Sequence, residues 1–264
     1  MPLKPSAAAS ASLIATKLLN VPALGGVVLM SRQDGHSWFC NGVALTTRRV
    51  LTAAHCCPGR TYLVSSPELD TGWVDKGETP KLRHDSQEIA SCEKAPTILL
   101  AESRALEHRS ADLAIVTLSK PLPLHVLPVQ RLARDFVVKK APILDLDGMS
   151  RNRLLQIAAS PAEAVVSQYV PPGRFAGTSV APMLAKVRFL GFDVAHGIAV
   201  LEGITNDLMM SGTSGSGVFV ETSPGDFRLI AIASGILEDG FNQAIMAVDV
   251  RPYAAWIDAE IGKP

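Results

Sequence analysis

Residues 50–56 read VLTAAHC and end an apolar run on a histidine, His55, that is surrounded by small residues. Such a histidine is held by its neighbours, and the Val- and Leu-rich run before it is typical of a buried β-strand. Taken alone, the pattern also fits a core histidine with a purely structural role. Two stretches further along the chain bear on the choice between these interpretations.

The two stretches supply an acid and a nucleophile. Residues 111–116 read ADLAIV and place Asp112 before an apolar strand, and residues 211–217 read SGTSGSG, a glycine-rich loop around Ser214. A serine hydroxyl becomes a good nucleophile when an imidazole takes its proton, and that imidazole needs an acceptor to fix its tautomer. The chain order His, Asp, Ser is one of the known orders of such triads. We therefore predict a catalytic triad of His55, Asp112 and Ser214.

The acid of this triad has competitors, because other aspartates also lie between His55 and Ser214. Only Asp112 directly precedes an apolar strand, which favours it. The others are Asp70, Asp75 and Asp85.

These motifs, in this order and spacing, resemble the trypsin/chymotrypsin-like serine proteases. The resemblance implies an all-β fold of two six-stranded antiparallel β-barrels of the chymotrypsin-like type with a C-terminal α-helix. It also implies a serine endopeptidase that acts on a protein or peptide substrate through an acyl-enzyme on Ser214. The oxyanion hole would be formed by the backbone N–H groups of Gly212 and Ser214, which a glycine-rich loop can orient.

The same resemblance assigns residues that contact substrate. Leu208, six residues before Ser214, would form an apolar floor of the primary specificity pocket, whereas a shifted register would place Asp207 there instead. Ser234 and Gly235 resemble the strand that pairs with the substrate backbone. The expected preference is therefore for apolar side chains before the cleaved bond.

The serine loop also departs from the usual family pattern. Thr213 precedes the nucleophile where most members have an aspartate, and Ser216 stands where a second glycine is usual. This loop sequence is similar to that of the bacterial glutamyl-endopeptidase-like branch of the family. Because the missing aspartate normally pairs with a newly cut N-terminus, we expect activity without such cleavage.

Four cysteines, an even number, fit an oxidising compartment. The resemblance implies a Cys40–Cys56 disulfide beside the histidine, whereas Cys57 and Cys92 could pair or stay as free thiols. Residues 1–20 match a signal peptide poorly and are interpreted as an N-terminal arm. We expect a secreted or periplasmic protein.

Composition limits the remaining partners. Lys and Arg number 25 and Asp and Glu also number 25, so charge predicts neither nucleic-acid nor anionic-membrane binding. The apolar runs are far shorter than the roughly 18 residues of a membrane span. A metal site at His55, Cys56, Cys57 and Cys92 lacks any recognised ligand spacing. We predict no metal and no cofactor, and we expect a monomer.

Short Val-, Ile- and Leu-rich runs separated by turn residues predict an all-β protein. The prolines at 121, 123 and 128 suggest a crossover, giving an N-terminal barrel over about 21–125, a C-terminal barrel over about 126–250 and a helix over about 252–262 within a domain spanning 21–264. The expected strands cover 26–30, 42–45, 50–53, 113–118, 164–170, 185–190, 217–220, 229–233 and 244–248.

Two other functions compete with the endopeptidase. A catalytically silent trypsin-like fold could act as a binding module, but silent relatives usually lose a triad residue, and all three residue types are present here. An esterase on another fold is disfavoured, because residues 212–216 lack the final glycine of a Gly-x-Ser-x-Gly elbow.

Overall fold

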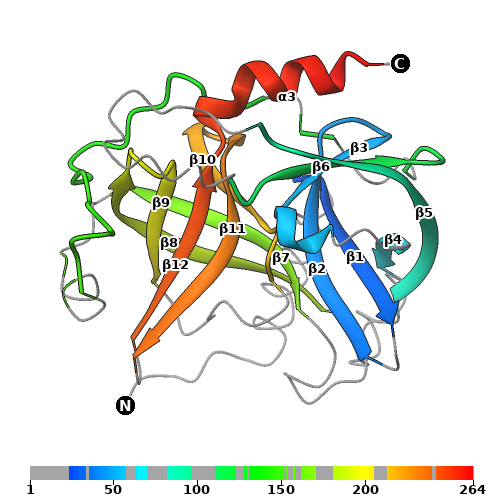
Figure 1. The fold of residues 1–264 in the computed structure, drawn as a ribbon, viewed down its shortest axis with the longest axis horizontal. Helices are drawn as coiled ribbons and strands as arrows, with labels where there is room; N and C mark the ends of the chain where they lie inside the picture. Colours follow the sequence, from blue (N-terminus) through cyan, green and yellow to red (C-terminus); the bar gives the residue numbers. More distant parts are fainter. Residues whose placement is uncertain are drawn as a thin grey trace.

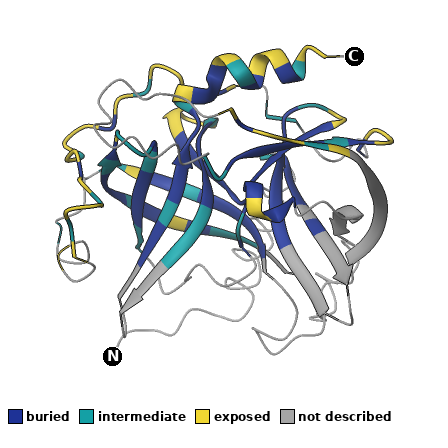
Figure 2. Ribbon diagram, viewed as in Figure 1, coloured by how far each residue is buried: buried dark blue, intermediate teal, exposed yellow. Residues whose placement is uncertain are grey.

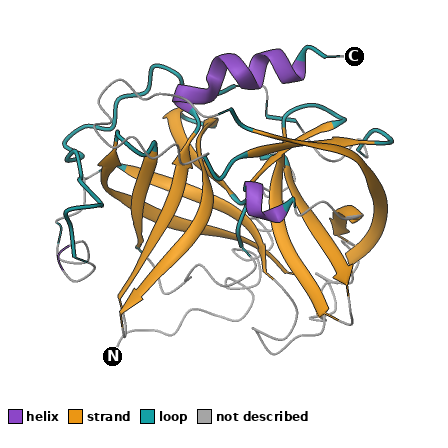
Figure 3. Ribbon diagram, viewed as in Figure 1, coloured by secondary structure: helices purple, strands orange, loops and turns teal. Residues whose placement is uncertain are grey.

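A computed structural model describes residues 24–33, 36–57, 63–69, 82–96, 111–122, 128–129, 131–150, 153, 157, 162–170, 181–204, 213–239 and 242–263. The predicted N-terminal arm lies outside these ranges. Within them, strands dominate and two closed barrels form, one after the other along the chain (Figure 3). The predicted chymotrypsin-like, all-β fold is confirmed.

The first barrel has the strand order β1-β2-β3-β6-β5-β4 and closes by antiparallel pairing of β1 with β4. Its interior is filled by apolar side chains such as Val27, Val50 and Val116. The strands are β1 (Gly26–Gln33), β2 (His36–Ala44), β3 (Arg49–Thr52), β4 (Leu63–Leu69), β5 (Leu82–Lys94) and β6 (Ala114–Leu118).

The second barrel repeats the same order, β7-β8-β9-β12-β11-β10, and closes by pairing of β10 with β7. Val166, Phe189 and Ile230 lie in its interior. The strands are β7 (Glu163–Val170), β8 (Ala181–Asp193), β9 (Ile198–Gly203), β10 (Gly217–Ser223), β11 (Asp226–Asp239) and β12 (Asn242–Asp249).

A third apolar cluster joins the barrels to the C-terminal helix. Side chains from both barrels, Leu51 and Phe219 among them, pack together with Ile257 of α3 (Ala254–Ile261). Figure 1 shows α3 lying over both barrels, and Figure 2 shows that buried residues alternate with exposed ones along this helix. Burial of this shared cluster holds the barrels and helix together.

Arg49 fastens the end of α3 to the first barrel. Its side chain is 8% exposed and donates hydrogen bonds to the carbonyls of Glu260 and Lys263 and to the Thr117 hydroxyl. A guanidinium bound to the last carbonyls of a helix satisfies groups that have no partner within the helix.

Three of the strands, β4, β5 and β9, were not predicted from the sequence. β4 and β5 carry many polar residues and therefore show no long apolar run, and the apolar part of β9 is only four residues long. Their positions are fixed by backbone pairing with neighbours, as in the long β4–β5 hairpin register. Among the described residues, no helix is long and apolar enough to cross a membrane.

All four cysteines form disulfides. Cys40 is bonded to Cys56 across 16 residues, and Cys57 to Cys92 across 35. The second pair was left open by the sequence, and it ties the histidine turn to β5. Adjacent residues of one turn are thus crosslinked to two different strands.

Loss of the Cys57–Cys92 bridge should destabilise the protein. In the loop-entropy description, a bridge of this span stabilises by up to about 4 kcal/mol. We expect the double variant Cys57→Ala/Cys92→Ala to lose roughly 2–4 kcal/mol of unfolding free energy in urea titrations. A variant with the wild-type urea midpoint would contradict this expectation.

Candidate active site

His55 sits on a single 3₁₀ turn, η1 (Ala54–Cys56), directly after β3. The flanking residues Ala54 and Cys56 are buried, whereas the histidine side chain is 48% exposed. Disulfides hold both the last residue of this turn, Cys56, and the next residue, Cys57, so the C-terminal end of the turn is fixed. The imidazole is therefore presented to solvent from a rigid support.

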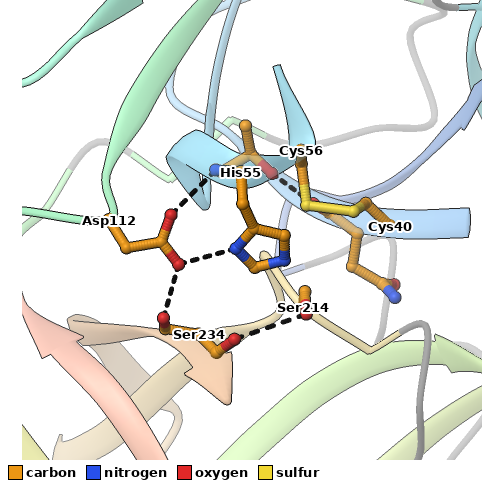
Figure 4. A network of polar contacts seen from close by, with 8 residues as sticks. Cys40, His55, Cys56, Asp112, Ser214 and Ser234 are labelled. Atoms are coloured by element: carbon orange, nitrogen blue, oxygen red, sulfur yellow. Dashed lines mark hydrogen bonds and ion pairs between the residues drawn. A yellow bond between two sulfur atoms is a disulfide. The ribbon is translucent and has the colours of Figure 1, made fainter. Parts of the chain in front are cut away.

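Asp112 lies just before β6 and holds the histidine through both carboxylate oxygens. Its Oδ1 accepts the His55 backbone N–H at 2.8 Å, and its Oδ2 contacts His55 Nδ1 at 2.7 Å. Ser234 donates its hydroxyl to the same Oδ2 at 2.5 Å (Figure 4). An ionised carboxylate only accepts hydrogen bonds, so Nδ1 carries the proton and Nε2 is left as the basic nitrogen.

The Ser214 loop is held by backbone contacts to both barrels. Asn41 in β2 donates its N–H to the Ser214 carbonyl at 2.6 Å, and Gly215 donates its N–H to the Ala233 carbonyl at 2.7 Å. The Ser214 hydroxyl donates to the Ser234 carbonyl at 3.5 Å (Figure 4). In the described part of the chain, no hydrogen bond joins this hydroxyl to His55.

Gly215 is required by the backbone. Its φ is +86°, in the left-handed region, and a Cβ there would lie 1.9 Å from the Asn41 carbonyl oxygen. Only glycine allows this conformation and this close approach together. The glycine after Ser214 therefore lets the loop lie directly against β2.

The surroundings raise the pKa of His55 and lower the pKa of Asp112. The hydrogen bond to Asp112, aided by its charge and opposed by partial burial, raises the pKa of His55 above the ordinary 6.5. For Asp112, desolvation is the largest effect and acts upward, but hydrogen bonds from His55 and Ser234 outweigh it and lower the pKa below 3.8. The pair is therefore poised as a carboxylate beside a histidine that readily accepts a proton.

These shifts predict the pH dependence of turnover. Only a neutral imidazole can accept the serine proton, so kcat/KM should fall as pH drops through the pKa of His55. Because that pKa is raised, we expect the midpoint of this acid limb above 6.5. Steady-state kinetics with an uncharged peptide would measure it, and a midpoint below 6.5 would contradict the expected pairing.

The structure brings His55, Asp112, Ser214 and Ser234 together from sites far apart in the chain. Ser234 was assigned to substrate binding by resemblance, and its hydroxyl has a further contact, with Asp112, that the sequence did not reveal. Gly235 follows it in β11. Gly212, Leu208 and the alternative Asp207 lie outside the described residues, so their assignments remain predictions.

The only potential metal cluster in the described ranges consists of Cys40, His55 and Cys56, whose ligand atoms lie within 4.8 Å of one another. Both sulfurs are bonded to each other in a disulfide. Metal binding by cysteine requires thiolates, so these residues do not fit a metal ion.

Comparison with known proteins agrees with this geometry. The sequence model of the family described as Trypsin matches residues 22–144, a stretch that includes His55 and Asp112. Over these residues the chain is similar to the trypsin-like serine proteases. No curated protein matches it.

Two solved structures resemble this chain along nearly its whole length. Neuropsin, a serine protease expressed in the limbic system of mouse brain, is 18% identical with a TM-score of 0.56, covering 90% of this chain and 94% of its own. An inactivated protease paralogue of the scabies mite is 18% identical with a TM-score of 0.60, covering 94% and 99%. At this identity the likeness shows the fold alone. None of these matches supports the glutamyl-endopeptidase branch.

Proposed function

We propose that this trypsin-like protein is a serine endopeptidase that forms an acyl-enzyme on Ser214. The observation that carries the proposal is the double attachment of His55 to Asp112, which leaves Nε2 as the base on a turn beside the serine loop. A pair of this kind is what a serine hydroxyl needs to become a nucleophile.

In the proposed reaction, Ser214 Oγ attacks the scissile carbonyl while His55 Nε2 takes its proton. The backbone N–H groups of Gly212 and Ser214 would stabilise the oxyanion. His55 then gives the proton to the leaving amine, and the amide bond breaks to leave an ester on Ser214. Water hydrolyses this ester by the same route, with His55 again as base. Asp112 stays ionised and stabilises the imidazolium.

The substrate class proposed is a protein or peptide with an apolar residue, Leu, Met or Phe, before the cleaved bond. An apolar pocket floor at Leu208 would leave an Arg or Lys side chain desolvated and unpaired. A peptide library gives the test, and a preference for Arg or Lys would favour Asp207 as the pocket residue instead.

Secretion or periplasmic export is proposed from the disulfides. Two bridges in the described chain are typical of an oxidising compartment. In freshly purified protein, thiol alkylation in denaturant without reductant should leave all four cysteines unlabelled, and labelling of any of them would contradict this proposal.

A catalytically silent binding module is the second candidate. Two observations favour it: the Ser214 hydroxyl contacts the Ser234 carbonyl and not His55, and a similar structure is an inactivated paralogue. The two candidates differ in whether Ser214 reacts with an electrophile.

A fluorophosphonate probe decides between them. An active enzyme should be labelled stoichiometrically, with the adduct on Ser214 by peptide mapping, and should cleave an unstructured protein such as casein. Ser216→Ala is the matched control, because Ser216 is fully buried two residues away in the same loop and should not alter the site of labelling. Absence of both labelling and cleavage would favour the binding module.

A further inference from the structure

We propose that the side chain of Asn41 is a positioning residue that fixes the distance between nucleophile and base by clamping the two barrels together beside the active site. The inference rests on the proposed endopeptidase function and deepens it. It is carried by the side-chain and backbone contacts of Asn41 and by the disulfide of its neighbour Cys40.

The first contact is a two-point clamp across the barrels. Asn41 in β2 is 1% exposed, its Oδ1 accepts the Tyr169 N–H at 2.6 Å, and its Nδ2 donates to the Tyr169 carbonyl at 3.0 Å. Tyr169 belongs to β7, 128 residues away, in the second barrel. One amide side chain thus satisfies both backbone groups of a buried residue, as a neighbouring strand would do.

The second contact is made by the main chain of the same residue. The Asn41 N–H holds the Ser214 carbonyl at 2.6 Å, and the Asn41 carbonyl accepts the Thr52 hydroxyl at 2.7 Å. The same carbonyl lies so close to Gly215 that a Cβ there would overlap it. The Asn41 backbone therefore forms the wall against which the nucleophile peptide rests.

The third link runs to the base. Cys40 precedes Asn41 in β2 and is disulfide-bonded to Cys56, which follows His55. Adjacent residues of one strand thus hold the base through a covalent bridge and the nucleophile through a backbone hydrogen bond. A displacement of this segment relative to the second barrel would move His55 and Ser214 by different amounts.

Such a displacement should act on turnover more than on substrate affinity. Asn41 has no predicted contact with substrate, whereas misplacement of reacting groups by about 1 Å can cost roughly 10²-fold. We expect Asn41→Asp to lower kcat ten- to a hundredfold and to change KM less than threefold. This variant keeps the size of the side chain and the acceptor for the Tyr169 N–H, but it turns an oxygen toward the Tyr169 carbonyl.

Asn41→Gly is the second variant, which removes the clamp without adding charge. Arg49→Met is the matched control, because Arg49 is also buried and its side chain also ties distant segments by hydrogen bonds, but at the α3 end of the first barrel. We expect the control to lower the melting temperature like the Asn41 variants while its kcat and its rate of Ser214 phosphonylation stay within twofold of wild type.

The outcomes separate this inference from the proposed function. Slower phosphonylation and lower kcat in either folded Asn41 variant, with near-normal KM and an active Arg49→Met protein, would support it. Folded Asn41 variants with wild-type kcat would overturn it. So would an Arg49→Met protein whose kcat falls as much as that of the Asn41 variants for the same decrease in melting temperature. A wild-type protein that neither reacts with the probe nor cleaves casein would overturn the proposed function itself, and the positioning role with it.

Discussion

Replacing Ser214 by alanine is expected to lower kcat about 10⁶-fold without unfolding the protein. The change removes the proposed nucleophile, so only the oxyanion hole and substrate binding are left to accelerate hydrolysis, about 10³- to 10⁴-fold over water. Its cost in stability should be small, because Ser214 is only partly buried and its hydrogen bond to the Ser234 carbonyl is long, at 3.5 Å.

The measurement is single-turnover hydrolysis of a peptide ester and a peptide amide, together with probe labelling. Circular dichroism and melting temperature should match wild type, which excludes unfolding as the cause. Ser216→Ala serves as the control and should keep turnover within about tenfold, since that hydroxyl is given no role in the proposed chemistry. Retention of wild-type turnover by Ser214→Ala, or probe labelling at another serine, would overturn the proposed nucleophile.

Asp112→Asn is the second large effect, with an expected loss of roughly 10⁴-fold in kcat. Three donors converge on the carboxylate: the His55 backbone N–H, His55 Nδ1 and the Ser234 hydroxyl. An asparagine has one acceptor oxygen, so its NH₂ group must face one side of this set. If that group faces Nδ1, the neutral ring carries its proton on Nε2 and can no longer take one from Ser214.

Two readouts distinguish this tautomer effect from general damage. The acid limb of kcat/KM should move to lower pH, because the carboxylate that raises the pKa of His55 is gone. Asp85→Asn is the matched control: Asp85 lies in β5, where its backbone pairs with Ser66 of β4. If Asp85→Asn abolished turnover while Asp112→Asn spared it, the wrong aspartate would have been assigned.

Much of the fold could be predicted from local pattern. Apolar runs such as that before His55 mark strands whose side chains are buried, and the motifs around His55 and Asp112 coincide with the stretch matched by the family model. β4 and β5 could not be found in this way. A strand with many polar residues is stabilised by backbone pairing with its neighbours, and the pattern of its own side chains does not predict which segments those neighbours are.

The active-site environment was less accessible to sequence. Ser234 and Asp112 are 122 residues apart, and Asn41 and Tyr169 are 128 apart. Serine and asparagine are common in loops and turns, so neither residue stands out until a partner is placed beside it. The pairing of Cys57 with Cys92 was likewise undetermined, because cysteine count limits pairings without choosing among them.

By itself, the sequence determined which residue types form the proposed triad and which strands lie beside them: a histidine after β3, an aspartate before β6 and a serine in a glycine-rich loop. These properties are local, since they depend on residues adjacent in the chain. Tertiary structure alone decided which groups meet, namely the Ser234 hydroxyl on Asp112, the Asn41 amide on Tyr169 and Cys57 on Cys92. Closure of two barrels against each other creates those contacts, and hydrogen bonds between distant residues depend on distances that only the packed chain fixes.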